Sequence, residues 1–298
     1  MSCMTAASAE EVPANPRPAS TVVLMRDGPD GPEVFMVRRH ENTAFMGGAY
    51  VFPGGRVDRS DGDADPSWCD GIPHAIAQVN DVSRDEALAF HVAGARELFE
   101  EAGVLLARGG AGRLVSLSDG GDHARFSRYR RDVHAGLATL RAVVEREHLR
   151  LALDGLILCA HWVTPPIDTR QFDTRFFMTR VPGDQVPAHD EMETTHGMWL
   201  KPSDALALSI RGDIILPPPT WTMLREIEPF ASVDAALLWA RTRRVVRRQP
   251  KLLIEDNGRR LLLLPGDPLY PEAPSADTPI ETRFVFDDQR WRATRCDK

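Results

Sequence analysis

Three glutamates, an arginine and a glycine within nine residues constrain this chain more than any other feature. The segment RELFEEAGV covers residues 96–104. Residues three or four apart on a helix project from the same region of its surface, so Glu97 would lie beside Glu100 and Glu101. Carboxylates held that close repel one another, and magnesium or manganese ions, which prefer hard oxygen ligands, relieve the repulsion. Arg96 precedes Glu100 by four residues and is placed to pair with it.

A solvated helix face is the ordinary alternative for an acidic cluster of this kind. The full pattern is more demanding than the acidic cluster alone. It has the form R-E-apolar-x-E-E-x-G-apolar and fixes seven positions, all of which this segment meets. We therefore predict a site for divalent cations at the end of a helix.

The helix that carries the segment has a predictable beginning and end. Ser83 and Glu86 have the spacing of a capping box, which indicates that the helix begins there. Gly103 stands where helices commonly end in a left-handed cap. Apolar residues recur between these points at helical spacing and predict one buried stripe: Leu88, Val92, Ala95, Phe99 and Ala102.

Strand patterning surrounds this helix. The runs STVVLMRD and EVFMVRRH, joined by the turn GPDGP, predict a hairpin, and AYVFPGGRVD, LILCAHWVTP and FDTRFFMTRVP predict further strands. This mixture predicts an α/β (α+β) fold. We expect a disordered lead-in over residues 1–19, a core domain over 20–208, and an extension over 209–298 packed on the core. That extension contains helices and a hairpin with Asn257-Gly258 as its two-residue turn.

Two stretches of the core domain differ in composition from the strands around them. Residues 62–82 are rich in Asp, Gly and Pro, and residues 109–150 are polar with helical patterning. We expect both to be insertions that leave the core.

Composition excludes several classes of protein. The formal net charge of -7 and the pI of about 5.7 argue against a nucleic-acid binder, which usually has a basic surface. The four cysteines lie far apart, which fits a reducing compartment better than a disulfide scaffold. The first residues lack the apolar stretch of a signal peptide, and no apolar run in this sequence is long enough for a membrane span, so we expect neither. We expect a cytoplasmic protein with no membrane or nucleic-acid partner, and a homodimer is an assembly that the sequence leaves open.

Residues 96–104 resemble the second half of the Nudix box, G-x5-E-x7-R-E-U-x-E-E-x-G-U, in which U is a bulky aliphatic residue. The first half resembles VFPGG, which ends at Gly55, so that Asp61 stands at the first glutamate of the box. Gly62 to Ala95 are 34 residues where the box has seven. An insertion into a loop has a small entropic cost, so the two halves can still meet in space.

The resemblance implies a Nudix fold, a mixed sheet between helices, and a catalytic site with Mg²⁺ or Mn²⁺. It implies that Asp61 has a mainly structural role, and that Glu100 or a glutamate from a later loop is the general base. We take Glu193 as that loop glutamate and Glu191 as the second choice. The metal ligands that it implies are Glu97, Glu100, Glu101, the Gly54 carbonyl and Glu193, with Arg96 orienting the carboxylates.

A box split by a long insertion resembles the branch of the family that contains the peroxisomal coenzyme A diphosphatase of animals. The coenzyme A signature of that branch precedes FPGG, and Gly48 and Arg39 fit it. Ala44 stands at its second arginine, and His40 at a position for Ser or Ala. Arg38 and Arg39 are candidates for contact with substrate phosphate, and solvated cations at a strand end are the alternative.

The resemblance thus implies hydrolysis of a nucleoside diphosphate linked to another group, with coenzyme A or an acyl-coenzyme A as the substrate. ADP-ribose or NADH is the alternative substrate. A nucleotide-sensing Nudix domain without catalysis is the alternative of another class. The intact set of Arg96, Glu97, Glu100 and Glu101 argues against that last alternative.

Overall fold

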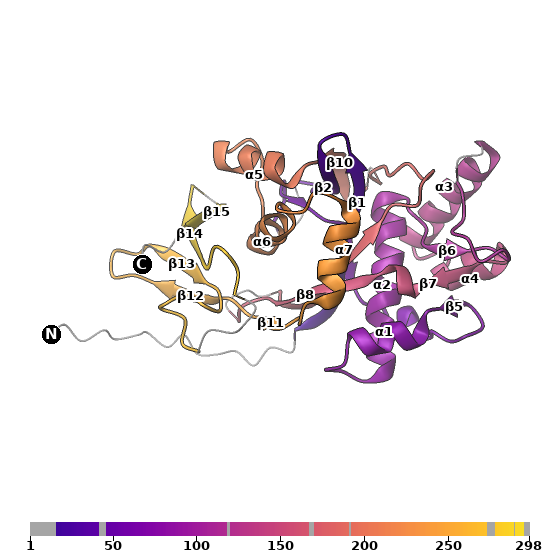
Figure 1. The fold of residues 1–298 in the computed structure, drawn as a ribbon, viewed down its shortest axis with the longest axis horizontal. Coiled ribbons are helices and arrows are strands. Elements are labelled where there is room, and N and C mark those ends of the chain that lie inside the picture. The colour runs from indigo at the N-terminus through magenta and orange to yellow at the C-terminus, as the bar shows by residue number, and fades with distance from the viewer. Residues whose placement is uncertain are drawn as a thin grey trace.

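The computed structural model describes residues 16–41, 46–117, 120–166, 170–190, 192–272, 278–288 and 290–294 (Figure 1). Its α-helices are α1 (Ile72–Gln78), α2 (Arg84–Ala102), α3 (Gly120–His134), α4 (Leu140–Arg146), α5 (Pro202–Arg211), α6 (Pro218–Ile227) and α7 (Val233–Thr242). Two 3-10 helices are η1 (Arg59–Gly62) and η2 (Leu153–Gly155).

The strands form three sheets. The eight-stranded sheet contains β1 (Arg17–Gly28), β2 (Gly31–Arg39), β3 (Tyr50–Val51), β4 (Gly54–Arg56), β8 (Ile157–Val163), β9 (Phe172–Arg180), β10 (Thr194–Leu200) and β11 (Arg247–Arg248). A small sheet contains β5 (Cys69–Asp70), β6 (Ala107–Arg108) and β7 (Arg150–Ala152). A C-terminal sheet contains β12 (Lys251–Ile254), β13 (Arg260–Leu263), β14 (Arg283–Asp287) and β15 (Arg290–Thr294).

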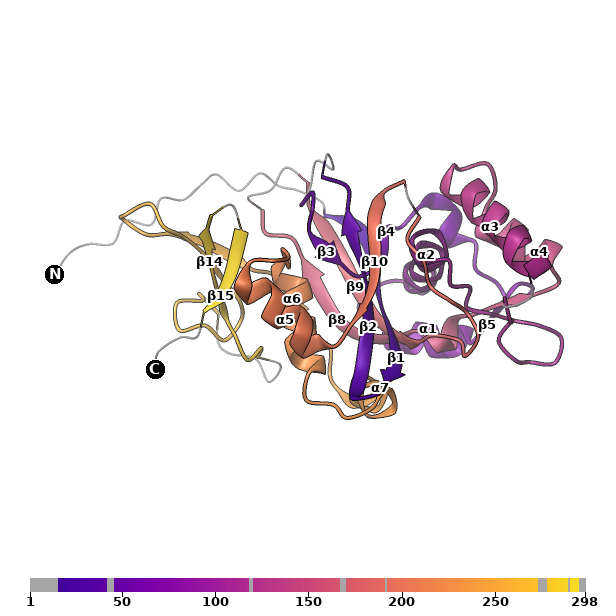
Figure 2. The ribbon, with the colours of Figure 1, turned by 90° about the horizontal axis from the view of Figure 1, so that it is seen from above.

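The large sheet is mixed and is covered on both faces. Its order is β10-β2-β1-β9-β8-β11, with β3 beside β2 and β4 beside β1, and β1 runs parallel to β9 but antiparallel to β2. Successive side chains of a strand point to opposite faces. Val22 and Leu24 accordingly pack in the core that contains α2, and Val23 and Met25 in the core that contains α6 and α7. Figure 2 shows the sheet standing between α1–α4 on one side and α5, α6 and the C-terminal sheet on the other.

Helix α2 begins and ends where its sequence predicts. Ser83 is the N-cap and forms a capping box with Glu86, and Gly103 ends the helix with φ 69°. The expected apolar stripe is buried, but so is every other residue from Ala87 to Ala102. The helix is therefore enclosed all round, and its charged last turns lie inside the molecule.

The first insertion does not leave the core, so that expectation is wrong. Trp68, Cys69, Ile72 and Ala75 are all buried in the cluster that packs α2 against the sheet. Strand β5 pairs with Leu151 and Ala152 of β7, which directly follow the second insertion, and so joins the first insertion to the end of the second in one small sheet. The second insertion is helical as expected, but it does not leave the core either, because its Phe126, Tyr129 and Val133 pack in the same cluster. Both insertions supply the outer wall around α2.

Replacing Trp68 by alanine tests this role of the first insertion. The Trp68 side chain is 1% exposed, so its loss leaves a cavity in the core. We expect the free energy of unfolding to fall by about 3–5 kcal/mol, measured by urea denaturation. The control is Leu137→Ala, at a side chain that is 79% exposed. If the free energy of unfolding changes equally little in both variants, the first insertion is not part of the core.

The two ends of the chain also contribute to the sheets. Strand β1 already begins at Arg17, inside the stretch expected to be disordered, and Arg17 lies opposite Phe172 of β9. At the other end, β11 extends the large sheet beside β8. The β12–β13 hairpin has a three-residue loop instead of the expected two, because Glu255 and Arg259 still pair and Gly258 (φ 82°) donates its N–H to the Glu255 carbonyl. This is a type I turn followed by a bulge.

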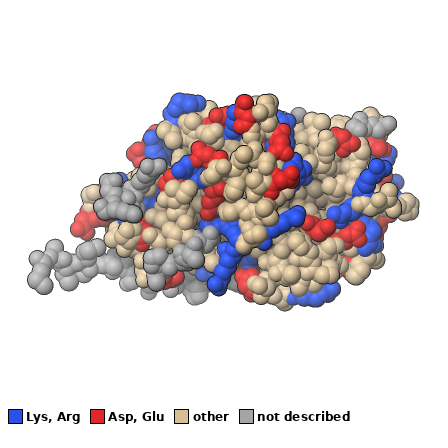
Figure 3. All heavy atoms as spheres, in the orientation of Figure 1, with Lys and Arg blue, Asp and Glu red and all other residues tan. Residues whose placement is uncertain are grey.

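No helix of the described ranges has the length and apolar character needed to cross a lipid bilayer. On the face seen in Figure 3, basic and acidic side chains are interspersed.

Candidate active site

The charged turns of α2 face a cavity of about 1260 Å³. Arg96, Glu97, Glu100 and Glu101 all line it, although each side chain is itself largely buried. The FPGG turn reaches the same cavity through β4, because β4 pairs with β1 directly beside α2. The two halves of the split box therefore meet in space, as the resemblance implied.

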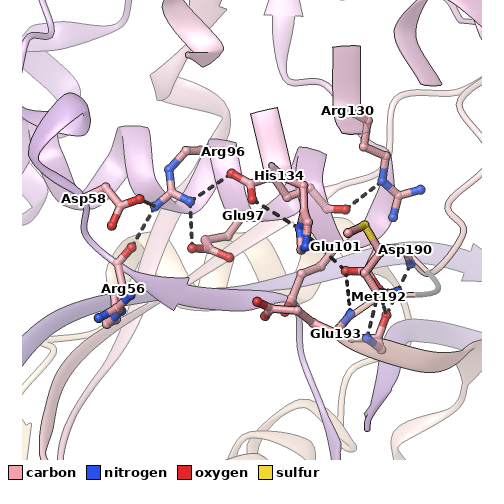
Figure 4. Close-up of polar contacts among 12 residues, drawn as sticks. Arg56, Asp58, Arg96, Glu97, Glu101, Arg130, His134, Asp190, Met192 and Glu193 are labelled. Atoms are coloured by element: carbon pink, nitrogen blue, oxygen red, sulfur yellow. Dashed lines mark hydrogen bonds and ion pairs between the residues drawn. The ribbon is translucent and has the colours of Figure 1, made fainter. Parts of the chain in front are cut away.

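Arg96 is the centre of the polar contacts (Figure 4). Its guanidinium donates to Asp61 through Nε (3.0 Å) and Nη2 (3.0 Å). Its Nη1 donates to Glu97 (2.8 Å) and to Glu100 (3.0 Å), and Nη2 also donates to the Arg56 carbonyl. One buried cation thus fixes the positions of three carboxylates. The structural role expected for Asp61 is confirmed by this geometry, since Asp61 is 1% exposed and orients Arg96.

The two glycines of the turn are needed for close approach to the carboxylates. The Gly54 N–H donates to Glu101 Oε2 at 2.8 Å. A Cβ on Gly54 would lie 2.4 Å from the Ser20 carbonyl oxygen, and a Cβ on Gly55 would lie 2.5 Å from Glu97 Oε1. Neither position can hold a larger residue without displacing a neighbour. That the Gly54 carbonyl binds a metal stays a prediction.

Burial shifts the titration of these glutamates. It raises the pKa of Glu97 to about 7, with the Glu100 charge adding to the rise and Arg96 opposing it. Burial and the charge of Glu97 raise the pKa of Glu101 well above its ordinary value, against the opposing effects of the Gly54 N–H and the Arg39 cation. The pKa of Glu100 is raised by burial as well. A cation bound beside these carboxylates would lower their pKa values again.

The donor set fits Mg²⁺ or Mn²⁺. Three buried carboxylates supply the hard oxygen ligands that these ions prefer, and Arg96 alone does not balance their charge. In the described part of the chain no three His, Cys, Asp or Glu side chains already converge as a ligand group. Arg96 instead holds Glu97 and Glu100 by hydrogen bonds.

Of the other predicted residues, some line the large cavity and others do not. Glu193 lines the large cavity, and its charge helps raise the pKa values of Glu97 and Glu101. Glu191 lies outside the described residues. Arg39 lines the cavity too, and its Nε is buried with no hydrogen-bond partner among the described residues. Arg38 instead pairs with Glu41 at 2.8 Å and does not line the cavity.

The second insertion brings residues to the site that the sequence did not indicate. His134, the last residue of α3, lies with Nδ1 at 3.6 Å from Glu100 Oε2 and at 3.8 Å from Asp190 Oδ2. Arg130 donates to the carbonyls of Glu100 and Ala188. The polar composition of α3 predicted a solvated helix, and its sequence carries no local signal that one end reaches α2.

Comparison with known proteins agrees with this geometry. The family model for the NUDT19 Nudix domain matches residues 77–227. The acyl-coenzyme A diphosphatase NUDT19 of Homo sapiens is 30% identical over 305 residues, which cover 86% of this chain and 77% of that protein. The Xenopus laevis protein of the same name is 25% identical over 275 residues, covering 81% and 72%.

A crystal structure of a NUDIX hydrolase from Alicyclobacillus acidocaldarius has a TM-score of 0.63 and 26% identity, covering 76% of this chain and 97% of that one. The expected Nudix fold and the expected likeness to the animal coenzyme A diphosphatases are thus confirmed. The chain belongs to the Nudix hydrolase family.

Proposed function

We propose that this Nudix hydrolase is a metal-dependent diphosphatase of coenzyme A and acyl-coenzyme A. The observation that carries the proposal is the buried set of Glu97, Glu100 and Glu101 around Arg96, which opens onto a cavity large enough for a nucleotide. The choice of substrate is supported by the relatives that are named acyl-coenzyme A diphosphatase.

The proposed reaction is hydrolysis of the diphosphate bridge. A water oxygen forms a bond to one phosphorus, and the bond from that phosphorus to the bridging oxygen breaks. The bridging oxygen leaves with the other phosphate, and the water proton passes to a carboxylate. The products are a phosphopantetheine, acylated or free, and an adenosine bisphosphate. Bound Mg²⁺ or Mn²⁺ would neutralise charge on the diphosphate and lower the pKa of the water.

The residues of this chain have three roles in the proposed reaction: metal binding, positioning of the metal ligands, and proton transfer. Glu97, Glu100 and Glu101 would hold the metal, and Arg96 and Asp61 keep them in position. We assign Glu193 to the role of general base instead of the metal-ligand role that the resemblance implied, because it is exposed at the cavity and its carboxylate makes no hydrogen bond or ion pair to another described residue. Glu100 is less free to accept a proton, since Arg96 holds it and His134 lies beside it.

Replacing Arg39 by alanine tests phosphate binding. Its guanidinium lines the cavity and its Nε lacks a partner within the described residues, so a substrate phosphate is the contact that it fits. We expect KM for coenzyme A to rise about tenfold or more, with a smaller change in kcat. Arg38→Ala is the matched control from the adjacent position, and steady-state kinetics that place the larger effect on Arg38 would contradict the assignment.

A substrate panel tests the proposed function directly. Coenzyme A, an acyl-coenzyme A, ADP-ribose, NADH and a diadenosine polyphosphate would each be incubated with Mg²⁺ and then with Mn²⁺. Chromatography with mass detection would identify the products, with a chelator as the control. We expect the coenzyme A compounds to have the highest kcat/KM. Preference for ADP-ribose or NADH would overturn the substrate, and nucleotide binding with no turnover of any compound would indicate a sensor.

A further inference from the structure

A second cavity of about 580 Å³ adjoins the site. Its lining residues come from the large sheet and the C-terminal sheet, and those in the core belong to the cluster on the side of the large sheet away from α2. Figure 2 shows the C-terminal sheet on that side. Five residues line both cavities and so place the two side by side: Thr21, Arg39, Gly54, Phe172 and Thr174. A ligand whose phosphates lie beside Arg39 can therefore extend into the second cavity.

The walls of the second cavity are mainly apolar. Trp162 and Phe176 come from the large sheet, and Leu252, Leu262 and Trp291 come from the C-terminal sheet. No aspartate, glutamate, asparagine or glutamine is found among the described residues that line it. Arg260 also lines it, and the buried Trp162 Nε1 has no hydrogen-bond partner among the described residues. Such a wall suits a chain of methylene and methyl groups, whose burial is favourable, with a polar amide placed to accept from Trp162.

The large cavity has the opposite character. Besides Arg96 and Arg39 it is lined by Arg17, Arg56 and Arg170, whose side chains form no ion pair with the other described residues. Cations of this kind suit a ligand that carries a phosphate in addition to the diphosphate. The adenosine half of coenzyme A carries such a phosphate, and the pantetheine half does not.

We propose that the apolar cavity beneath the C-terminal sheet binds the pantetheine arm and the acyl chain of an acyl-coenzyme A. The proposal rests on the proposed function and adds the site that selects acylated substrates. It places the adenosine bisphosphate half on the arginine side of the large cavity. The C-terminal sheet, which has no part in the Nudix box, thereby supplies one wall of the substrate site.

The C-terminal sheet is held in place to form this wall. Arg225 of α6 pairs with Glu281, just before β14, at 3.0 Å. Arg290 of β15 donates to the Gly212 carbonyl at the end of α5, at 3.2 Å. Leu262 and Phe284 from this sheet are buried in the same core as α6 and α7. The cavity is thus a built part of the fold.

Leu252→Glu tests the assignment, because it places a carboxylate on the apolar wall at a half-buried position. Ile254→Glu is the matched control: it adds the same charge to the same strand at a side chain that is 60% exposed and does not line the cavity. Calorimetry would measure the binding of the two product halves, S-hexanoyl-4′-phosphopantetheine and adenosine 3′,5′-bisphosphate. Thermal denaturation would verify that each variant is folded.

Leu252→Glu is expected to weaken binding of the acylated arm by about tenfold or more. The affinity of this variant for the bisphosphate should stay within about twofold of that of the wild-type protein. The affinity of Ile254→Glu should stay within the same limit for both ligands. Loss of bisphosphate binding instead would assign the cavity to adenosine, and unchanged binding of both ligands would also overturn the proposal.

The wild-type protein provides a second measurement that needs no variant. Across acyl-coenzyme A substrates of increasing chain length, kcat/KM should rise by up to about fourfold per methylene until the cavity is filled. A flat series would contradict the proposal. If the protein hydrolyses coenzyme A but Leu252→Glu weakens binding of the bisphosphate, the cavity assignment is rejected and the proposed function is retained. If Leu252→Glu weakens binding of the acylated arm but the wild-type protein hydrolyses no coenzyme A compound, the proposed function is rejected and the cavity assignment is retained.

Discussion

Glu101→Gln is expected to lower kcat/KM by about a thousandfold or more, which corresponds to about 4 kcal/mol of lost transition-state stabilisation. Glu101 is buried beside Glu97 and receives the Gly54 N–H from the other half of the box. Glutamine keeps an oxygen that can accept this N–H but loses the negative charge that a divalent cation requires. The variant should therefore fold and yet bind Mn²⁺ poorly.

The stability of this variant separates its effect on catalysis from an effect on folding. Burial raises the pKa of Glu101, which means that the ionised carboxylate costs stability in the metal-free protein. Removing the charge should leave the melting temperature unchanged or higher at pH 8. Glu193→Gln is the comparison variant, and it should lower kcat while Mn²⁺ binding is retained. Turnover close to normal in Glu101→Gln would contradict the metal assignment.

Arg96→Met is expected to lower the free energy of unfolding by about 3–5 kcal/mol. Arg96 is 7% exposed and its guanidinium donates to Asp61, Glu97 and Glu100, so its loss leaves three buried carboxylates uncompensated. The damage should be smaller at pH 5.5 than at pH 8. Carboxyl groups with raised pKa values are protonated at low pH and then carry no charge to bury.

Urea denaturation at both pH values checks this prediction. Arg108→Met is the control, because Arg108 pairs with Asp154 where both side chains are partly exposed, at 24% and 40%. Removal of such a pair costs about 1 kcal/mol or less. Equal losses in the two variants would mean that Arg96 does not hold the site together.

Local patterns predicted the local structure well. Ser83 and Glu86 identified the start of α2, Gly103 identified its end, and runs of apolar residues bounded by turns identified the strands of the large sheet. Each of these signals acts over a few residues, so a single sequence suffices to find it. The resemblance to the Nudix box then placed β4 beside α2 although 34 residues separate the two halves in the sequence.

Contacts between distant elements were not predictable in the same way. The composition of residues 62–82 indicated a surface loop, yet Trp68 and Ile72 are buried against α2. Helix α3 is polar by sequence, yet His134 reaches Glu100. The apolar cavity combines Trp162 with Leu252 from the other end of the chain. Such contacts depend on how whole elements pack, and no periodicity within one element specifies its partner.

Calorimetric titration of Mn²⁺ into the metal-free protein at pH 6 and pH 7 tests the central claim most directly. Glu97 has a pKa of about 7 and that of Glu101 is raised well above its ordinary value, so the metal must displace protons to bind. The affinity for Mn²⁺ should rise about tenfold per pH unit for each proton displaced. Titrations in two buffers with different ionisation enthalpies would detect the released protons. Glu101→Gln should lose both the Mn²⁺ binding and the proton release. Absence of Mn²⁺ binding, or binding that is the same at both pH values and in Glu101→Gln, would contradict the account.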